Sequence, residues 1–413
     1  MLLLDLALLL PSLEAAIRII NLRYLRYHGN EIPSGFEGVI DATTLGRMSA
    51  YAGDTGRLGL ASHLVAQALI ILAIFGGALE RYDQWIAHVS HSLIIQGVCF
   101  FLGVSWCFVL ISLPFGMVSS FVIEQRFGFN HTTKGLFWAD FAKGLLLSTV
   151  FVLVLTSCGL CLVKWSPQFW WVLVWLFFLV FEVTVTLVAP RLIEPLFMKT
   201  TPLEREELEA DICALAKSTG VKVDRVFQVD ASRRSGHTNA YFTGLGPVKR
   251  VILFDTLLEK LDRAEILAVL AHELGHWKLR HISKSFVMFQ ALALGAIYGA
   301  YRFINWEGLP SLIGAAHCSF PMRVSIAMFT GSLVSVCLSP CLKALSRRHE
   351  WQADNFARGL VEPSALASGL IKLAVDNLAN LHPHPLYSAY YASHPTVVAR
   401  VARLRSHDGT VGI

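Results

Sequence analysis

Charged side chains are scarce in this chain. Asp, Glu, Lys and Arg make up 16% of its 413 residues, whereas a soluble globular protein carries roughly a quarter. Hydrophobic residues reach 54%, and they gather in blocks close to the roughly 20 residues that a helix needs to cross a bilayer. The shortage of charge therefore excludes an ordinary soluble domain and predicts a mostly α-helical, polytopic membrane protein.

Other common signatures are missing as well. Eight cysteines are scattered, and the CxxC of Cys158 and Cys161 has no second pair nearby, so the sequence indicates neither disulfides nor a cysteine metal site. The net charge of +5 is not gathered in one patch, which argues against nucleic-acid binding. Residues 1–20 are interrupted by Asp5 and Glu14 and make a poor signal peptide. They form either a first membrane helix or an interfacial one.

Hydropathy predicts seven apolar segments. They lie at residues 1–20 and near 58–80, 93–122, 144–163, 168–190, 284–305 and 321–343. The connecting loops alternate between rich and poor in Lys and Arg, which places 191–283 and 344–413 on one side of the membrane, the cytoplasmic one. The predicted organisation is thus about five membrane helices (1–190), a polar insert (191–283), two further membrane helices (284–343) and a C-terminal region (344–413).

The polar insert has the pattern of a compact α+β unit. An amphipathic stretch ends at Gly220, which predicts a helix stop. The β-branched stretches VDRVFQVDAS and VKRVILFD are typical of strands, and SGHTNAYFTGLG between them predicts a strand bounded by turns. Asp262 and Glu265 have the spacing of a capping box, so we expect a helix that begins there and runs through His276 toward the membrane.

The stretch HELGH at 272–276 indicates metal chemistry. Residues four apart share one face of a helix, so His272 and His276 can offer both imidazoles to one metal ion. Glu273 is rotated off that face but stays close, which suits a general base that does not bind the metal. The alternative is a solvated helix face with incidental histidines. The apolar lead-in LAVLA and the strong helix start favour the metal site.

A third metal ligand must come from elsewhere, because a catalytic zinc site has three protein ligands and one open position. Ile282 stands where the extended motif would have a histidine, and His281 has the wrong spacing to share the helix face. Glu350 is the best candidate, because a hairpin of the last two membrane helices would return it to the side of HELGH. Asp354, four residues on, would orient a histidine ligand. The spacing of these two acids alone is equally consistent with a metal site and with ordinary surface residues.

Several stretches resemble peptidase family M48, and more closely its CAAX prenyl protease 1 (Ste24-type) branch. They are LPFGMVSSFVIEQRFGFN, SGHTNAYFTGLGPVKRVILFDTLL, LAVLAHELGHWKLRH, SRRHEWQADNFA and SHPTVVARVARL. The first stretch is the more specific sign of this branch, and the shorter HtpX-type members of the family have fewer membrane helices. The resemblance implies a ring of seven membrane helices around a water-filled chamber, with a zinc site at its cytosolic end.

The resemblance also implies roles for single residues near HELGH. Three of them would bind one Zn²⁺ ion per chain: His272, His276 and Glu350. Glu273 would be the general base, and Asp354 would orient a histidine ligand without binding the metal.

Two further regions take roles by the same resemblance. Asn239, Ala240 and Tyr241 would lie on the strand that holds the substrate backbone beside the metal. His394 and Arg400 match a C-terminal His and Arg that reach the active site. We expect His394 to donate to the developing oxyanion and Arg400 to contact substrate.

These features predict an integral-membrane zinc metalloendopeptidase that cleaves near the C-terminus of prenylated CAAX-type proteins. Its partners would be a peptide or protein substrate and membrane lipid. We expect it in a bacterial inner membrane or the endoplasmic reticulum membrane, with its active site on the cytoplasmic side. A second interpretation is a general quality-control peptidase of the HtpX type. A third is a transporter or channel, because seven helices with internal charges fit that too. HELGH on a helix argues against this last one.

Overall fold

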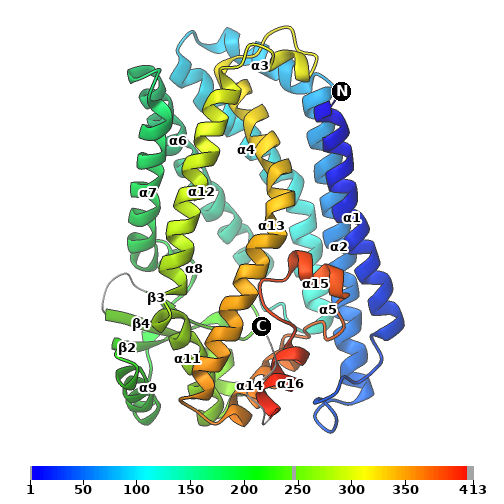
Figure 1. Ribbon diagram of the computed structural model, residues 1–413, viewed down its shortest axis with the longest axis vertical. Coiled ribbons are helices and arrows are strands. Elements are labelled where there is room, and N and C mark those ends of the chain that lie inside the picture. The colour runs from blue at the N-terminus through cyan, green and yellow to red at the C-terminus, as the bar shows by residue number, and fades with distance from the viewer. Residues whose placement is uncertain (1, 244–247, 407–413) are drawn as a thin grey trace.

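A computed structural model describes residues 2–243 and 248–406, and seven long helices dominate this part of the chain (Figure 1). Their bounds are α1 Leu2–His28, α2 Ala42–Phe75, α4 Leu93–Val118, α6 Lys134–Trp165, α7 Trp170–Leu192, α12 His281–Ile304 and α13 Phe320–Arg358. Shorter elements join them: α3 Ala78–Val89, the π-helical turn η1 Ser119–Glu124, α5 Gln125–Phe127, α8 Glu194–Phe197 and the 3₁₀ turn η3 Pro310–Leu312.

Six of the long helices are long and apolar enough to cross a membrane, which confirms a polytopic membrane protein. Their most apolar stretches have a mean hydropathy between 1.3 and 2.5. Helix α1 is not among the six, because each 18-residue stretch of it carries at least three charged residues. About seven spans were expected and six meet the criteria of length, hydropathy and charge. Helix α1 packs along α2 as a seventh long helix with more charged residues (Figure 1).

The long helices contact one another in a closed ring. In the order α1, α2, α4, α6, α7, α12 and α13, each helix packs on the next, and α13 returns to α1. Only 6 to 22% of the residues in the apolar stretches of the six spans are buried. A helix with its apolar stripe against a packed core would bury roughly a quarter to a third of its residues. Protein therefore covers little of the inner faces, as expected for helices around a chamber.

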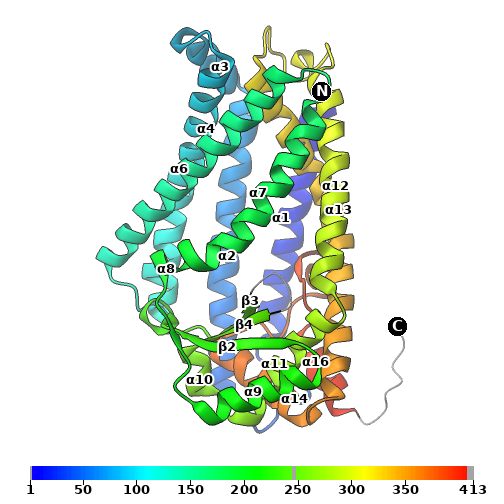
Figure 2. The same cartoon turned by 90° about the vertical axis from the view of Figure 1, so that its left-hand side faces the viewer.

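One end of the ring is closed by an apolar cluster. Phe100 of α4, Met322 of α13 and Leu3 of α1 are buried there together. Asp83 of α3 is also buried and accepts hydrogen bonds from the backbone N–H and the hydroxyl of Ser319, the residue before α13. The inserted α+β unit lies at the opposite end of the ring (Figures 1 and 2).

The insert forms a four-stranded sheet with helices packed on it (Figure 2). Its elements are β1 Thr200–Pro202, α9 Glu206–Ser218, β2 Lys222–Val229, the 3₁₀ turn η2 Ala231–Arg233, β3 Ala240–Thr243, β4 Val248–Phe254, α10 Asp255–Lys260 and α11 Arg263–Lys278. The strand order is β1-β2-β4-β3, with β2 and β4 parallel and both outer strands antiparallel to their neighbours. The α+β pattern is confirmed, while the short β1 had no sequence signal. Strand β3 lies at one edge of the sheet.

Helix α11 begins where the sequence predicts. Asp262 caps it, and Asp262 and Glu265 form the expected capping box. The helix runs through His276 and ends at Lys278. Arg280 then has a φ of 58°, in the left-handed region that costs energy for a residue with a Cβ. This turn separates α11 from α12, so the two helices need not share one axis or one set of faces.

Helix α13 is much longer than the apolar segment that predicted it. Hydropathy marked 321–343, whereas the helix has 39 residues. At 1.5 Å per residue, its last turns extend about 20 Å beyond the apolar part. Glu350 and Asp354 therefore lie on the membrane helix itself, where it packs on α11. The C-terminal helices that follow are α14 Pro363–Asp376, α15 Pro385–Tyr391 and α16 Val397–Arg405.

Candidate metal centre

Three side chains converge where α11 packs on α13: His272, His276 and Glu350. Their candidate ligand atoms all lie within 4.8 Å of one another. The two histidine Nε2 atoms are 3.2 Å apart, and each lies 3.3 Å from a carboxylate oxygen of Glu350. Atoms about 2.05 Å from a tetrahedral metal ion lie about 3.3 Å from one another. The triangle therefore has the size of one face of a tetrahedral coordination shell.

The chemistry of these atoms also fits a cation. Glu350 Oε2 is buried and has no hydrogen-bond partner among the described residues. His272 and Glu350 are only 6% and 4% exposed, so water does little to screen their charges. Two imidazole lone pairs 3.2 Å apart repel each other unless a cation lies between them. Two imidazoles and one carboxylate are a donor set of catalytic metal sites, so the residues fit a divalent metal.

A buried ion pair orients His272. Its Nδ1 lies 2.7 Å from Asp354 Oδ1, and Arg400 of α16 donates to both oxygens of Asp354 at 2.9 and 2.6 Å. An Nδ1–H donated to Asp354 leaves the Nε2 lone pair aimed at the metal position. Burial opposes a charge on the ring, yet the carboxylates of Asp354 and Glu350 raise the pKa of His272 to about 9. The surroundings of this imidazole therefore favour a bound cation.

A second relay orients His276, and the sequence did not predict it. His276 Nδ1 lies 3.2 Å from Nδ1 of His281, whose Nε2 lies 2.9 Å from Gln352 Oε1. When His281 donates Nε2–H to Gln352, its Nδ1 accepts the N–H of His276, and the Nε2 lone pair of His276 points to the metal position. Sequence spacing excluded His281 as a metal ligand, and it is not in the candidate ligand group. Its supporting contact with His276 had no sequence signal, because it follows the left-handed turn at Arg280.

We expect His281→Ala to lower the metal affinity of the purified protein about 10- to 100-fold, because His276 loses the acceptor that fixes its tautomer. Competition with a chelator of known affinity measures the change. The matched control is His88→Ala, which removes an exposed histidine of α3 at the far end of the ring. An affinity equal to that of the wild type would show that the relay does not support the metal site.

Glu273 is partly exposed and follows His272 on α11. Burial raises the pKa of Glu273 above its ordinary value of 4.5, and the nearby His272 and His276 oppose that rise. A carboxyl group with a raised pKa is a better proton acceptor near neutral pH than an ordinary surface glutamate. Its position and its pKa both suit a general base, a role that stays a prediction.

The two C-terminal candidates differ in exposure. His394 is 61% exposed at its side chain, and its Nε2 lies 3.3 Å from Glu350 Oε1, so it reaches the metal centre from the solvent side. Arg400 is only 7% exposed and lies behind His272, with its donors directed to Asp354. This burial does not favour the direct substrate contact that we expected of Arg400, and places it instead where it holds Asp354.

Asn239, Ala240 and Tyr241 lie at the edge of the sheet. Strand β3 pairs with β4, with Ala240 opposite Leu253, and among the described strands it has no partner on its other side. It also contacts α11, the helix that carries two of the candidate ligands. Asn239 is exposed, and its side chain accepts a hydrogen bond from the Ala240 N–H at 2.8 Å. The structure thus offers a strand edge, unpaired among the described strands, on the helix that carries His272 and His276.

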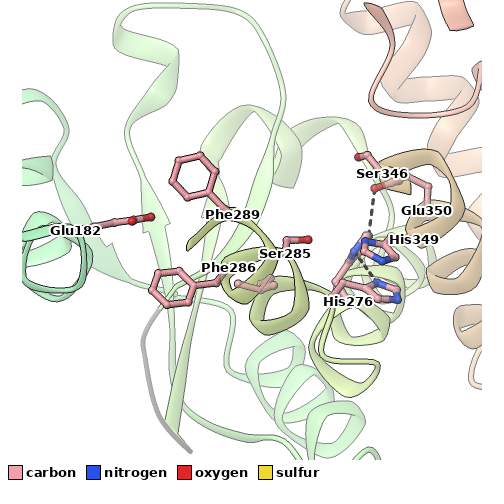
Figure 3. Close-up of a pocket in the computed structure, with 10 residues that line it drawn as sticks. Glu182, His276, Ser285, Phe286, Phe289, Ser346, His349 and Glu350 are labelled. Carbon is pink, nitrogen blue, oxygen red and sulfur yellow. Dashed lines mark hydrogen bonds and ion pairs between the residues drawn. The ribbon is translucent and has the colours of Figure 1, made fainter. Parts of the chain in front are cut away.

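A cavity of about 450 Å³ opens beside the candidate ligands (Figure 3). His276 and Glu350 line it at one end, and Glu182 of α7 lies across the cavity from them. Phe286 and Phe289 of α12 lie between the two ends. The cavity therefore joins the metal centre to the inside of the helical ring. Ile282, Phe286 and Phe289 are the apolar part of its lining, and the other residues that line it are polar or ionisable.

Comparisons with known proteins agree with this geometry. Residues 21–199 match the model of the CAAX prenyl protease N-terminal region with five membrane helices, and residues 202–408 match peptidase family M48. The CAAX prenyl protease 1 homolog of Oryza sativa subsp. japonica is 33% identical over 97% of this chain and 98% of the relative. CAAX prenyl protease 1 of Saccharomyces cerevisiae is 31% identical over 92% and 90%. The crystal structure of S. mikatae Ste24p has a TM-score of 0.89 at 27% identity and covers 98% of both chains.

Proposed function

This chain belongs to peptidase family M48 and is an integral-membrane metalloprotease of the CAAX prenyl protease 1 type, and we propose that it uses one Zn²⁺ ion to hydrolyse peptide bonds near the C-terminus of prenylated CAAX-type proteins. The observation that carries the proposal is the triangle of His272, His276 and Glu350, contributed by α11 and α13. The membership of the chain in a peptidase family also excludes the transporter interpretation.

The proposed metal is zinc because two imidazoles and one carboxylate, with a fourth position open, are a common catalytic zinc set. When bound, zinc polarises the substrate carbonyl and the attacking water. His272 and His276 would hold the ion through nitrogens whose tautomers are set by Asp354 and His281. The chain would thus supply a rigid ligand set for the ion.

In the proposed reaction, Glu273 moves one proton. Its carboxylate accepts the proton from the attacking water and then gives it to the nitrogen of the leaving amine, so that the group returns to its starting state. His394 donates from its exposed imidazole to the carbonyl oxygen as negative charge develops there. Its Nε2, 3.3 Å from Glu350, lies close enough to the ligands to reach that oxygen.

The edge strand β3 is the proposed binding site for the substrate backbone. An extended peptide adds to a free strand edge through main-chain hydrogen bonds, which fixes its register without demanding particular side chains. Residues 239–241 supply that edge, and the contact of β3 with α11 supports its place beside the metal.

We also propose that the centre lies on the cytoplasmic side of an endoplasmic reticulum or bacterial inner membrane. The two regions rich in Lys and Arg, 191–283 and 344–413, both contribute to the end of the ring where the α+β unit lies (Figure 1). An excess of these residues on one side is typical of cytoplasmic segments.

The substrate class is tested with matched peptides. We expect the purified protein to cleave a farnesylated peptide ending in a CAAX sequence at least about 10-fold more efficiently, by kcat/KM, than the same peptide without the lipid. Each buried methylene contributes about 0.8 kcal/mol, and Ile282, Phe286 and Phe289 offer an apolar surface in the cavity beside the ligands. Equal cleavage of both peptides would favour the broader quality-control peptidase. Cleavage of neither peptide would contradict the proposed function.

A further inference from the structure

The segment that leads into β3 is attached to the membrane helices. Residues 231–238 form this lead-in segment. Gly236 N–H donates to the carbonyl oxygen of Phe129 at 3.0 Å, and Arg234 forms an ion pair of 2.8 Å with Asp140 of α6. The candidate substrate strand is therefore tied to the ring on the side from which the chain enters it.

His237 is the most highly connected residue of this segment. Its Nε2 lies 3.2 Å from Glu124 Oε2, and its ring stacks on Phe129 with the ring centroids 4.1 Å apart. Its Nδ1 lies 3.1 Å from Asn377 Oδ1 on the loop after α14. Glu124 also accepts a hydrogen bond of 2.6 Å from the hydroxyl of Tyr51 on α2. Side chains from α2 and from the turn after α4 thus meet beside one imidazole, which precedes β3 by three residues.

The position of Glu124 depends on an irregular turn of the membrane helix. Helix α4 passes into the π-helical turn η1, and Glu124 is its last residue. Such turns insert one extra residue into a helix and occur often at functional sites. Glu124 belongs to the stretch VIEQRFGFN, whose residues take no part in the metal chemistry. The hydrogen bond to Glu124 raises the pKa of His237 above its ordinary value.

We propose that Glu124 and His237 form a positioning pair that fixes β3 beside α11 and so sets the register in which the substrate backbone meets the metal centre. This inference rests on the proposed function, because it gives β3 a substrate to hold. Strand register matters because a shift by one residue turns every side chain to the opposite face. The pair holds the lead-in segment of the strand and includes none of the candidate ligands, so neither residue is catalytic.

A second attachment points the same way. The Asn377 side chain accepts a hydrogen bond of 3.0 Å from the Thr238 N–H and donates to the Thr238 hydroxyl at 3.1 Å. Thr238 is buried and immediately precedes the exposed Asn239. His237 and Thr238 therefore hold the backbone next to the strand from both the membrane side and the α14 side.

The proposal is tested by Glu124→Gln in the full-length protein, with the farnesylated CAAX peptide as substrate. We expect KM to rise about 10-fold, as for the loss of one charge-assisted hydrogen bond, while kcat stays within about twofold of the wild type. A change of this kind removes binding that the ground state and the transition state share. Metal content should be unchanged, because the substitution does not touch a candidate ligand.

Three further variants separate positioning from a general structural role. His237→Gln should raise KM to the same extent, and the double variant should be no worse than either single one, because both remove the same interaction. Asp83→Asn is the matched control, since this acid also holds a loop against a membrane helix but lies at the far end of the ring. It should leave KM unchanged. If Glu124→Gln does not fold, Tyr51→Phe tests the same pair with a smaller rise in KM.

The outcomes are distinct. An unchanged KM in Glu124→Gln, a fall in kcat alone, or additive effects in the double variant would each overturn the positioning pair. A wild type that cleaves no peptide would contradict the proposed function instead. In that case the dissociation constant of the same peptide, measured by fluorescence anisotropy, still tests the pair: about 10-fold weaker binding to Glu124→Gln supports it, and equal binding overturns it.

Discussion

Glu273→Gln is expected to abolish peptide cleavage and to leave the bound metal in place. Glutamine keeps the shape of the side chain but cannot accept a proton from water at neutral pH. Glu273 is not part of the group of residues that could hold a metal ion, His272, His276 and Glu350. General-base catalysis contributes about 10²- to 10⁴-fold, so kcat should fall by that factor while the metal-binding group stays complete.

The measurement pairs two assays on the same purified sample. Elemental analysis gives the metal content, and cleavage of the farnesylated CAAX peptide gives kcat. Glu259→Gln is the matched control, because it makes the same chemical change at an exposed acid of α10. A Glu273→Gln variant that cuts at the wild-type rate would show that the base is another residue. Loss of metal from this variant would mean that Glu273 supports the ligands.

Hydropathy predicted the membrane helices because each span is a long apolar block, but it did not predict where they end. The polar last turns of α13 carry no apolar signal, yet the helix continues to Arg358 because α11 and the C-terminal helices pack on it. Helix α1 shows the opposite limit. It is a long helix in the ring, but charges such as Glu14 and Arg18 exclude it from the six candidate spans.

The candidate ligands also differ in how far the sequence could predict them. His272 and His276 follow from the i, i+4 geometry of one helix, which sequence spacing describes fully. Glu350 required a further step, because its approach to the histidines depends on the packing of two helices. The roles of His281 and of the pair of Glu124 and His237 had no usable signal. They depend on a left-handed turn at Arg280 and on contacts between residues more than 100 positions apart.

His272→Ala is expected to release the metal and, with it, all peptide cleavage. The variant would leave two of three candidate ligands, and it would also leave the Asp354–Arg400 pair without the imidazole that it orients. Asp354→Asn is the graded comparison, because it keeps every candidate ligand and weakens the support of His272 together with the ion pair to Arg400. We expect it to lower metal affinity about 10- to 100-fold.

Elemental analysis and thermal unfolding with and without a chelator distinguish these variants. A metal that binds only the folded protein stabilises it by mass action, so the chelator should lower the Tm of the wild type and leave that of His272→Ala unchanged. Asp354→Asn should respond at a lower chelator concentration than the wild type, because its ion is held less tightly. One metal ion retained per His272→Ala chain would place the metal elsewhere. The buried oxygen of Glu350 that has no hydrogen-bond partner among the described residues would then need another explanation.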